Sequence, residues 1–119
     1  MVVKVALVVL ADTETHADRA RVANALTTAY EFKEAGDEVD LIFTGAGTKW
    51  IGELSNPDHR LHRAFEMVKD EVTGACKACA MAFDVKEEVQ ASGIPLLTEY
   101  KGHQSLRQRV IQGYQVITF

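Results

Sequence analysis

Two cysteines separated by two residues, Cys76 and Cys79, are the residues of this sequence whose type and spacing could do chemistry. A thiolate is a nucleophile, and its pKa falls when helix N-terminal N–H groups or positive charges face it. Cys76 is expected at the end of a strand and Cys79 about one helical turn later, with Lys77 as a nearby positive charge. This setting predicts a stabilised thiolate that could attack a persulfide or a disulfide, while the second thiol resolves the product.

Two other interpretations of the pair stay open. Free cysteine also packs well as a small buried residue. A structural zinc site needs four ligands, usually in two pairs, and the chain has only two cysteines. Zinc would need histidines or a second subunit to complete its ligands. The sequence therefore favours thiol chemistry, with no metal and no cofactor.

The apolar pattern predicts strands and helices that alternate along the whole chain. Strands are expected at 2–10, 39–43, 72–76, 94–97 and 114–119. Helices are expected from the capping residues at 12–15 to about 35, from Pro57 onward, at 77–83, at 85–92 and at 104–111, and a short turn or helix is expected at 50–54. This alternation predicts a three-layer α/β/α fold in one domain of 119 residues, with a five-stranded, mainly parallel sheet between two helical layers.

Loops that follow parallel strands meet at the carboxyl edge of the sheet, where ligands of such folds bind. Segments 11–15, 44–49 and 76–79 are expected at that edge. His16 could act there as an acid or base near the thiols, although capping or surface placement is its more ordinary role. Trp50 could cover the thiols, fill an interface or simply pack in the core.

The loop after the fourth strand reaches the same edge and carries Tyr100 and His103. Both are candidates for the wall of a pocket, and a polar helix N-terminus is the plainer interpretation. Arg107 and Arg109 follow in the last helix, where they could face solvent, an interface or an acidic partner.

Other motifs favour structural roles. Segment 45–49 lacks the spacing of a phosphate-binding loop and follows the second strand, so it predicts a tight turn. No dinucleotide-binding fingerprint is present. His59 and His62 lie three residues apart with Glu66 beyond, but without a third clear ligand they indicate a solvated helix face rather than a metal site.

Composition limits the partners. The net charge is −4 and basic residues form no stripe, which argues against binding to nucleic acid. The apolar N-terminal run is interrupted by Lys4 and is too short to cross a membrane. We therefore expect a cytoplasmic protein, a compartment in which cysteines are kept as thiols.

Segment 74–85, GACKACAMAFDV, followed by 91–97, ASGIPLL, resembles the DsrE/DsrF-like family. Members of this family begin with a strand like 3–10, continue into a long helix, and place a cysteine where the third strand gives way to a helix. The YchN type has two cysteines spaced like Cys76 and Cys79, and the persulfide-carrying cysteine of the TusD type matches Cys76.

The resemblance implies intracellular sulfur transfer or thiol redox chemistry, with sulfur donor and acceptor proteins as partners. It also implies a sheet with the first strand in its centre, and homo-oligomers, trimers or hexamers, with the cysteines near subunit interfaces. A non-catalytic oligomeric binding module is the alternative, because a fold is shared more widely than an activity. Asp84 stands where the family commonly has glycine.

Overall fold

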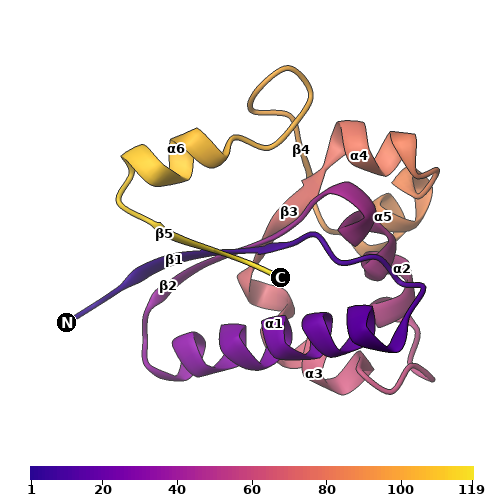
Figure 1. Cartoon of the computed structure of the whole chain (residues 1–119), viewed down its shortest axis with the longest axis horizontal. Coiled ribbons are helices and arrows are strands. Elements are labelled where there is room, and N and C mark those ends of the chain that lie inside the picture. The colour runs from indigo at the N-terminus through magenta and orange to yellow at the C-terminus, as the bar shows by residue number, and fades with distance from the viewer.

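A computed structural model describes residues 1–119 and contains one five-stranded sheet (Figure 1). The strands are β1 (Lys4–Val9), β2 (Glu38–Phe43), β3 (Val72–Cys76), β4 (Leu96–Leu97) and β5 (Gln115–Thr118). Their order is β4-β3-β2-β1-β5, and every neighbouring pair is parallel. The predicted α/β fold is confirmed. The strand in the centre, however, is β2 and not β1, because only β5 lies beyond β1 while β3 and β4 both lie beyond β2.

Helices cover both faces of this sheet. They are α1 (His16–Glu34), α2 (Trp50–Ser55), α3 (His62–Val68), α4 (Lys77–Ala82), α5 (Lys86–Ser92) and α6 (Leu106–Ile111), with two 3-10 turns, η1 (Gly45–Lys49) and η2 (Lys69–Glu71). Helices α1 and α3 lie on one side of the sheet and α6 on the other (Figure 1). None of the helices combines the length and the apolar character needed to cross a bilayer.

The alternation of strand side chains decides which residues meet which helices. Leu7 of β1 and Ala75 of β3 belong to the apolar core that includes Leu26 of α1. Their chain neighbours Val8 and Cys76 are also fully buried, but on the opposite face. The last residue of β3 therefore presents its sulfur on the side of the sheet that carries α6.

The segment between α2 and α3 differs from its predicted form. Residues 56–61 make consecutive turns, and α3 begins at His62 rather than at Pro57. The Asn56 side chain accepts the N–H of Asp58 at 2.9 Å, so it closes an Asx turn instead of capping a helix.

The two histidines of this region are also placed differently from the prediction. His59 lies in the turns and packs edge-on against Trp50, with ring centroids 5.9 Å apart. His62 is half-buried and its Nδ1 lies 2.7 Å from the carbonyl oxygen of Leu54. A shared solvated helix face is therefore wrong for this pair, because each ring is used to hold the chain around α2.

Helix α4, which follows Cys76, is closed by a Schellman motif at Asp84. The N–H of Val85 donates to the carbonyl of Ala80 at 2.8 Å, and the N–H of Asp84 donates to Met81 at 3.1 Å. This motif needs a left-handed residue after the helix, usually glycine. Asp84 adopts a φ of 57°, so aspartate takes a glycine conformation at some energetic cost.

Replacing Asp84 by glycine should therefore stabilise the protein. We expect Asp84→Gly to raise the free energy of unfolding by about 0.5–1 kcal/mol, because relief of the left-handed strain exceeds the added chain entropy. Asp84→Ala is the matched variant and should lower it by about 1 kcal/mol, because alanine avoids positive φ. Urea denaturation of both variants checks this, and equal stabilities of the two would contradict it.

Candidate functional site

The loops that follow the strands meet at one edge of the sheet, as expected. The Nζ atom of Lys49 lies 2.7 Å from Oδ1 of Asp12 and 2.9 Å from Oε1 of Glu14, which ties the second loop to the first. The hydroxyl of Thr44 lies 3.7 Å from Sγ of Cys79, which ties the second loop to the third. The charge of Lys49 is thus matched by two carboxylates, in keeping with a structural turn at this position.

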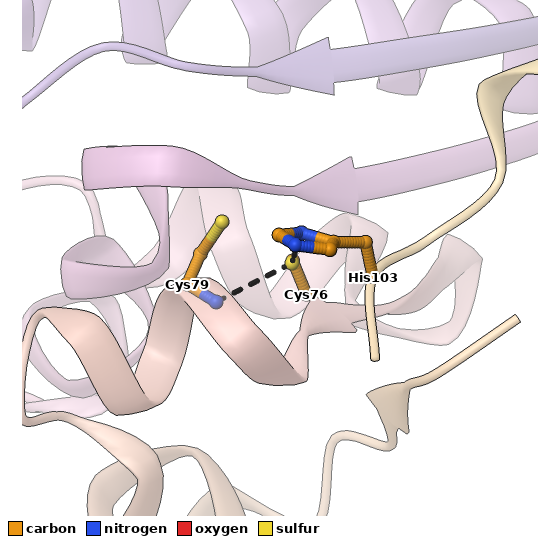
Figure 2. Close-up of side chains that lie close together, drawn as sticks. All are labelled: Cys76, Cys79 and His103. Carbon is orange, nitrogen blue, oxygen red and sulfur yellow. Dashed lines mark hydrogen bonds between the residues drawn. The ribbon is translucent and has the colours of Figure 1, made fainter. Parts of the chain in front are cut away.

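Three side chains capable of chemistry converge at this edge, Cys76, Cys79 and His103 (Figure 2). Sγ of Cys76 lies 3.2 Å from Nδ1 of His103, and the N–H of Cys79 lies 3.4 Å from the same sulfur. The two sulfurs and the imidazole nitrogen all lie within 4.8 Å of one another. Both cysteines are free thiols; Cys76 is buried, Cys79 is half-buried and His103 is exposed.

A tight turn aims His103 at the sulfur. Tyr100 and His103 exchange two backbone hydrogen bonds, of 2.9 and 2.8 Å, around Lys101 and Gly102. Both central residues have positive φ, 49° and 82°, as in a type I′ hairpin turn. The carbonyl of Gly102 also accepts the N–H of Ala78 at 3.0 Å, so the turn is fastened to the first turn of α4.

A buried arginine holds the chain on either side of that turn. Only 3% of Arg109 is exposed. Its Nε donates to Asp40 of β2 at 3.0 Å, and its Nη1 donates to the carboxylate of Glu99 and to the carbonyl of Ser105. Glu99 also accepts the N–H of Ser105 at 2.9 Å. The loop that carries His103 is therefore anchored at both ends to one guanidinium.

The two thiols differ in acidity. Burial raises the pKa of Cys76, and backbone N–H groups offset this only in part. Burial also acts on Cys79, but hydrogen bonds from Cys76, the Thr44 hydroxyl and the N–H of Gly45 outweigh it and lower its pKa. The N–H of Cys79 at the helix start does act to lower the pKa of Cys76, as expected, but burial outweighs it at this inner thiol. Lys77 is not among the groups that shift this pKa.

The other predicted site residues lie around this cluster without joining it. Trp50 is 1% exposed, and its indole N–H donates to the carbonyls of residues 11 and 12 at 3.0 Å each, so it packs as a core residue. His16 is exposed at the start of α1, 2.9 Å from the guanidinium of Arg19. Lys77 is half-buried and makes no hydrogen bond or ion pair with either sulfur. Tyr100 lines an open hollow of about 340 Å³ next to the site.

Thr44 and Gln104, which the sequence did not single out, lie beside the cysteine and histidine cluster. The Thr44 hydroxyl donates to Oε1 of Gln104 at 3.1 Å, and Gln104 directly follows His103. Thr44 stands at the end of β2, where a polar side chain after a buried strand was the only available signal. For Arg109 the sequence allowed contact with solvent, with an interface or with an acidic partner. The structure pairs it instead with Asp40 and Glu99 of its own chain.

Comparisons with known proteins agree with this architecture. A model of the DsrE/DsrF-like family matches residues 4–119. The chain is 39% identical to the uncharacterized protein MJ0733 of Methanocaldococcus jannaschii over 94 residues. This matched region covers 79% of this chain and 76% of that protein.

Two solved structures resemble the fold. One is the conserved protein of unknown function BT1422 from Bacteroides thetaiotaomicron, with a TM-score of 0.66 and 21% identity over 96% of this chain and 94% of that one. The other is the ychN protein from E. coli, with a TM-score of 0.58 and 16% identity over 98% and 99%. At these identities the two structures show the fold alone.

The difference between the thiols predicts an order of reaction. Cys79 should be alkylated by iodoacetamide several-fold faster than Cys76 at neutral pH, because it is more exposed and its pKa is lower. Cys76→Ala removes a hydrogen bond to Cys79 and should move the alkylation profile of Cys79 to higher pH, whereas Cys76→Ser should move it less. Peptide mass spectrometry across pH measures both, and faster labelling of Cys76 would contradict the assignment.

The arginine anchor predicts a loss of stability. Arg109→Met leaves two partly buried carboxylates without their partner and should lower the free energy of unfolding by roughly 2–3 kcal/mol at neutral pH. Arg107→Met, at an exposed position of the same helix, is the matched control and should change little.

The effect should depend on pH. Burial acts to raise the pKa of Glu99, but the hydrogen bond from Arg109 outweighs it and the pKa is lowered. The ion pair therefore stabilises the fold at pH values where Glu99 is ionised, and this stabilisation disappears as Glu99 becomes protonated. The difference between wild type and Arg109→Met should therefore shrink as the pH falls below 4.5, the ordinary value for this carboxyl, and through the lowered pKa of Glu99. A difference that stays constant while the protein is acidified through that range would show that the ion pair is not its origin.

Proposed function

The chain belongs to the DsrE/DsrF-like family. From this premise we propose that it passes sulfane sulfur between protein thiols through Cys79, with Cys76 as a resolving thiol that can instead discharge the bound sulfur as sulfide. The observation that carries the proposal is the imidazole of His103 set 3.2 Å from the buried sulfur of one cysteine, with the second, half-buried cysteine beside it. A base, an inner thiol and an outer thiol are the parts that an exchange between thiols needs.

Cys79 takes the first step in this proposal. Its thiolate attacks the outer sulfur of a donor persulfide, R–S–SH, the S–S bond of the donor breaks, and R–S⁻ leaves. Cys79 then carries –S–SH. An acceptor thiolate attacks that outer sulfur in the same way, takes it away as its own persulfide, and regenerates the Cys79 thiolate. The partial exposure and the lowered pKa of Cys79 support this assignment.

Cys76 acts as the resolving thiol. Nδ1 of His103 accepts the proton of the Cys76 thiol, and the resulting thiolate attacks the inner sulfur of the Cys79 persulfide. A Cys76–Cys79 disulfide forms, and HS⁻ leaves. This order reverses the one that the family resemblance suggested, in which Cys76 is the sulfur carrier, because burial hides Cys76 from a donor.

The predicted homo-oligomer stays a prediction. Apolar side chains of α6 and β5 are exposed in the single chain, namely Val110, Ile111, Val116 and Ile117. They form the surface that such an assembly would be expected to cover, near the edge strand β5.

Sulfur loading tests the function directly. The reduced, metal-free chain is incubated with glutathione persulfide, and the mass gain of one sulfur atom is mapped to a peptide. We expect Cys76→Ser to accumulate the persulfide on Cys79, because resolution is blocked, whereas the wild type releases sulfide and forms the disulfide. Cys79→Ser should gain several-fold less sulfur.

The controls separate chemistry from folding. The double variant Cys76→Ser, Cys79→Ser should keep the wild-type circular dichroism and gain no sulfur. Sulfur uptake on Cys76 alone would keep the relay and overturn the order of the thiols. If neither cysteine gains sulfur in the folded protein, the proposed function is lost, and the same variants then serve to test the non-catalytic binding module.

A further inference from the structure

We propose that Cys76, Cys79 and His103 form a three-ligand binding site for Zn²⁺ within a single chain. The two cysteines alone are too few ligands for zinc. The fold adds a third ligand, 24 residues beyond Cys79 along the sequence, when the hairpin turn at 100–103 brings His103 onto the sulfur of Cys76 (Figure 2). The site uses the same thiols as the proposed function but does not depend on it, because metal binding requires no sulfur transfer.

The distances fit the coordination sphere of zinc. With Zn–S near 2.3 Å and Zn–N near 2.1 Å, tetrahedral geometry places a sulfur and a nitrogen about 3.6 Å apart and two sulfurs about 3.8 Å apart. Sγ of Cys76 and Nδ1 of His103 are 3.2 Å apart, and all three ligand atoms lie within 4.8 Å of one another. The first of these separations must open by about 0.4 Å, and the other two exceed the zinc values by at most about 1.2 Å.

The chemistry of the ligands selects the class of ion. Two thiolates and one imidazole favour zinc or another thiophilic ion over magnesium and calcium, which prefer oxygen ligands. The two thiolates carry two negative charges, so a divalent cation leaves this partly buried site neutral. Neutralisation removes much of the desolvation cost that a lone thiolate bears at Cys76.

The surroundings hold the ligands in place before any metal arrives. The N–H of Cys79 points at Sγ of Cys76 at 3.4 Å, the kind of hydrogen bond that orients a metal-bound thiolate. The Thr44 hydroxyl contacts Sγ of Cys79 at 3.7 Å. The backbone of His103 is fixed by the two hydrogen bonds to Tyr100 and, beyond the turn, by the anchor at Arg109.

Three protein ligands leave one tetrahedral position for water. Structural zinc sites are closed by four protein ligands, whereas sites with three keep an exchangeable fourth position. His103 is exposed and Cys79 is half-buried, so the solvent side of the cluster is where that water binds. The site therefore has an open coordination position, unlike the closed sites in which zinc serves only to hold a fold.

Zinc titration of the reduced, metal-free full-length chain tests the proposal. With a chromophoric chelator as competitor, we expect one Zn²⁺ per chain. His103→Ala should weaken binding at least about tenfold, and Cys79→Ser should do the same. His16→Ala is the matched control, a histidine exposed at the same edge of the sheet, and should bind as the wild type does.

Cobalt substitution identifies the ligands by spectroscopy. Co²⁺ bound to the wild type should show a thiolate-to-metal charge-transfer band, which each single cysteine variant reduces by about half and which His103→Ala keeps, while its visible d–d bands shift. Fewer than one metal ion per chain, affinity in His103→Ala equal to that in His16→Ala, or a cobalt complex without the thiolate band would each overturn the site. Sulfur loading is measured in metal-free protein, so either proposal can fail while the other holds.

Discussion

Arg109 carries a buried positive charge on a helix whose other residues are half-buried or exposed. Burying a guanidinium is costly unless its N–H groups find acceptors, and charged acceptors compensate best. Asp40 comes from the central strand and Glu99 from the loop after β4, while Arg109 itself belongs to α6. The ion pairs therefore fix the three elements relative to one another. That arrangement sets both ends of the loop in which His103 lies, so the site inherits its geometry from an ion cluster that takes no part in its chemistry.

Much of the fold could be predicted from the sequence because its signals are local. The apolar, β-branched run of β1 and the side-chain cap of α1 within residues 12–15 each follow from the residues themselves. The family resemblance, rather than a local signal, marked Asp84 as a residue in a glycine position, and its φ of 57° is left-handed. The start of α3 could not be placed, since Asn56 and Pro57 suit an Asx turn as well as a helix N-terminus.

The candidate site could be predicted only in part, because its decisive contacts join distant segments. The cysteine pair was visible in the sequence, and His103 was visible only as a residue at the correct edge of the sheet. Its approach to Cys76 depends on a type I′ turn at Lys101–Gly102, and lysine at positive φ is not a recognisable turn signal. The burial of Arg109 was equally hidden, since its partner Asp40 lies 69 residues away.

The acidity of the two thiols shows how the strand-to-helix junction makes equivalent residues unequal. Cys76 is the last residue of a strand, so strand alternation turns its sulfur inward, where burial raises its pKa. Cys79 lies in the first turn of α4, where the N–H of Gly45 donates to its sulfur and the Thr44 hydroxyl of the same loop lies 3.7 Å from it. A pair that began within one helix would lack this division. The spacing of two residues therefore produces an inner and an outer thiol only because a strand ends at the first of them.

The proposed sulfur transfer and the proposed zinc binding would compete for the same three side chains, and linkage would make the competition reciprocal. A persulfide on Cys79 removes one thiolate from the metal site and weakens zinc binding. Bound zinc, by the same free energy, disfavours the persulfide. His103 cannot be both the base that accepts the proton of Cys76 and a ligand through the same nitrogen, Nδ1. Zinc at a concentration well above its dissociation constant would keep both thiols bound and unreactive, and so protected from oxidation. Removal of the zinc would free the imidazole base and the two thiols, which are already positioned to react.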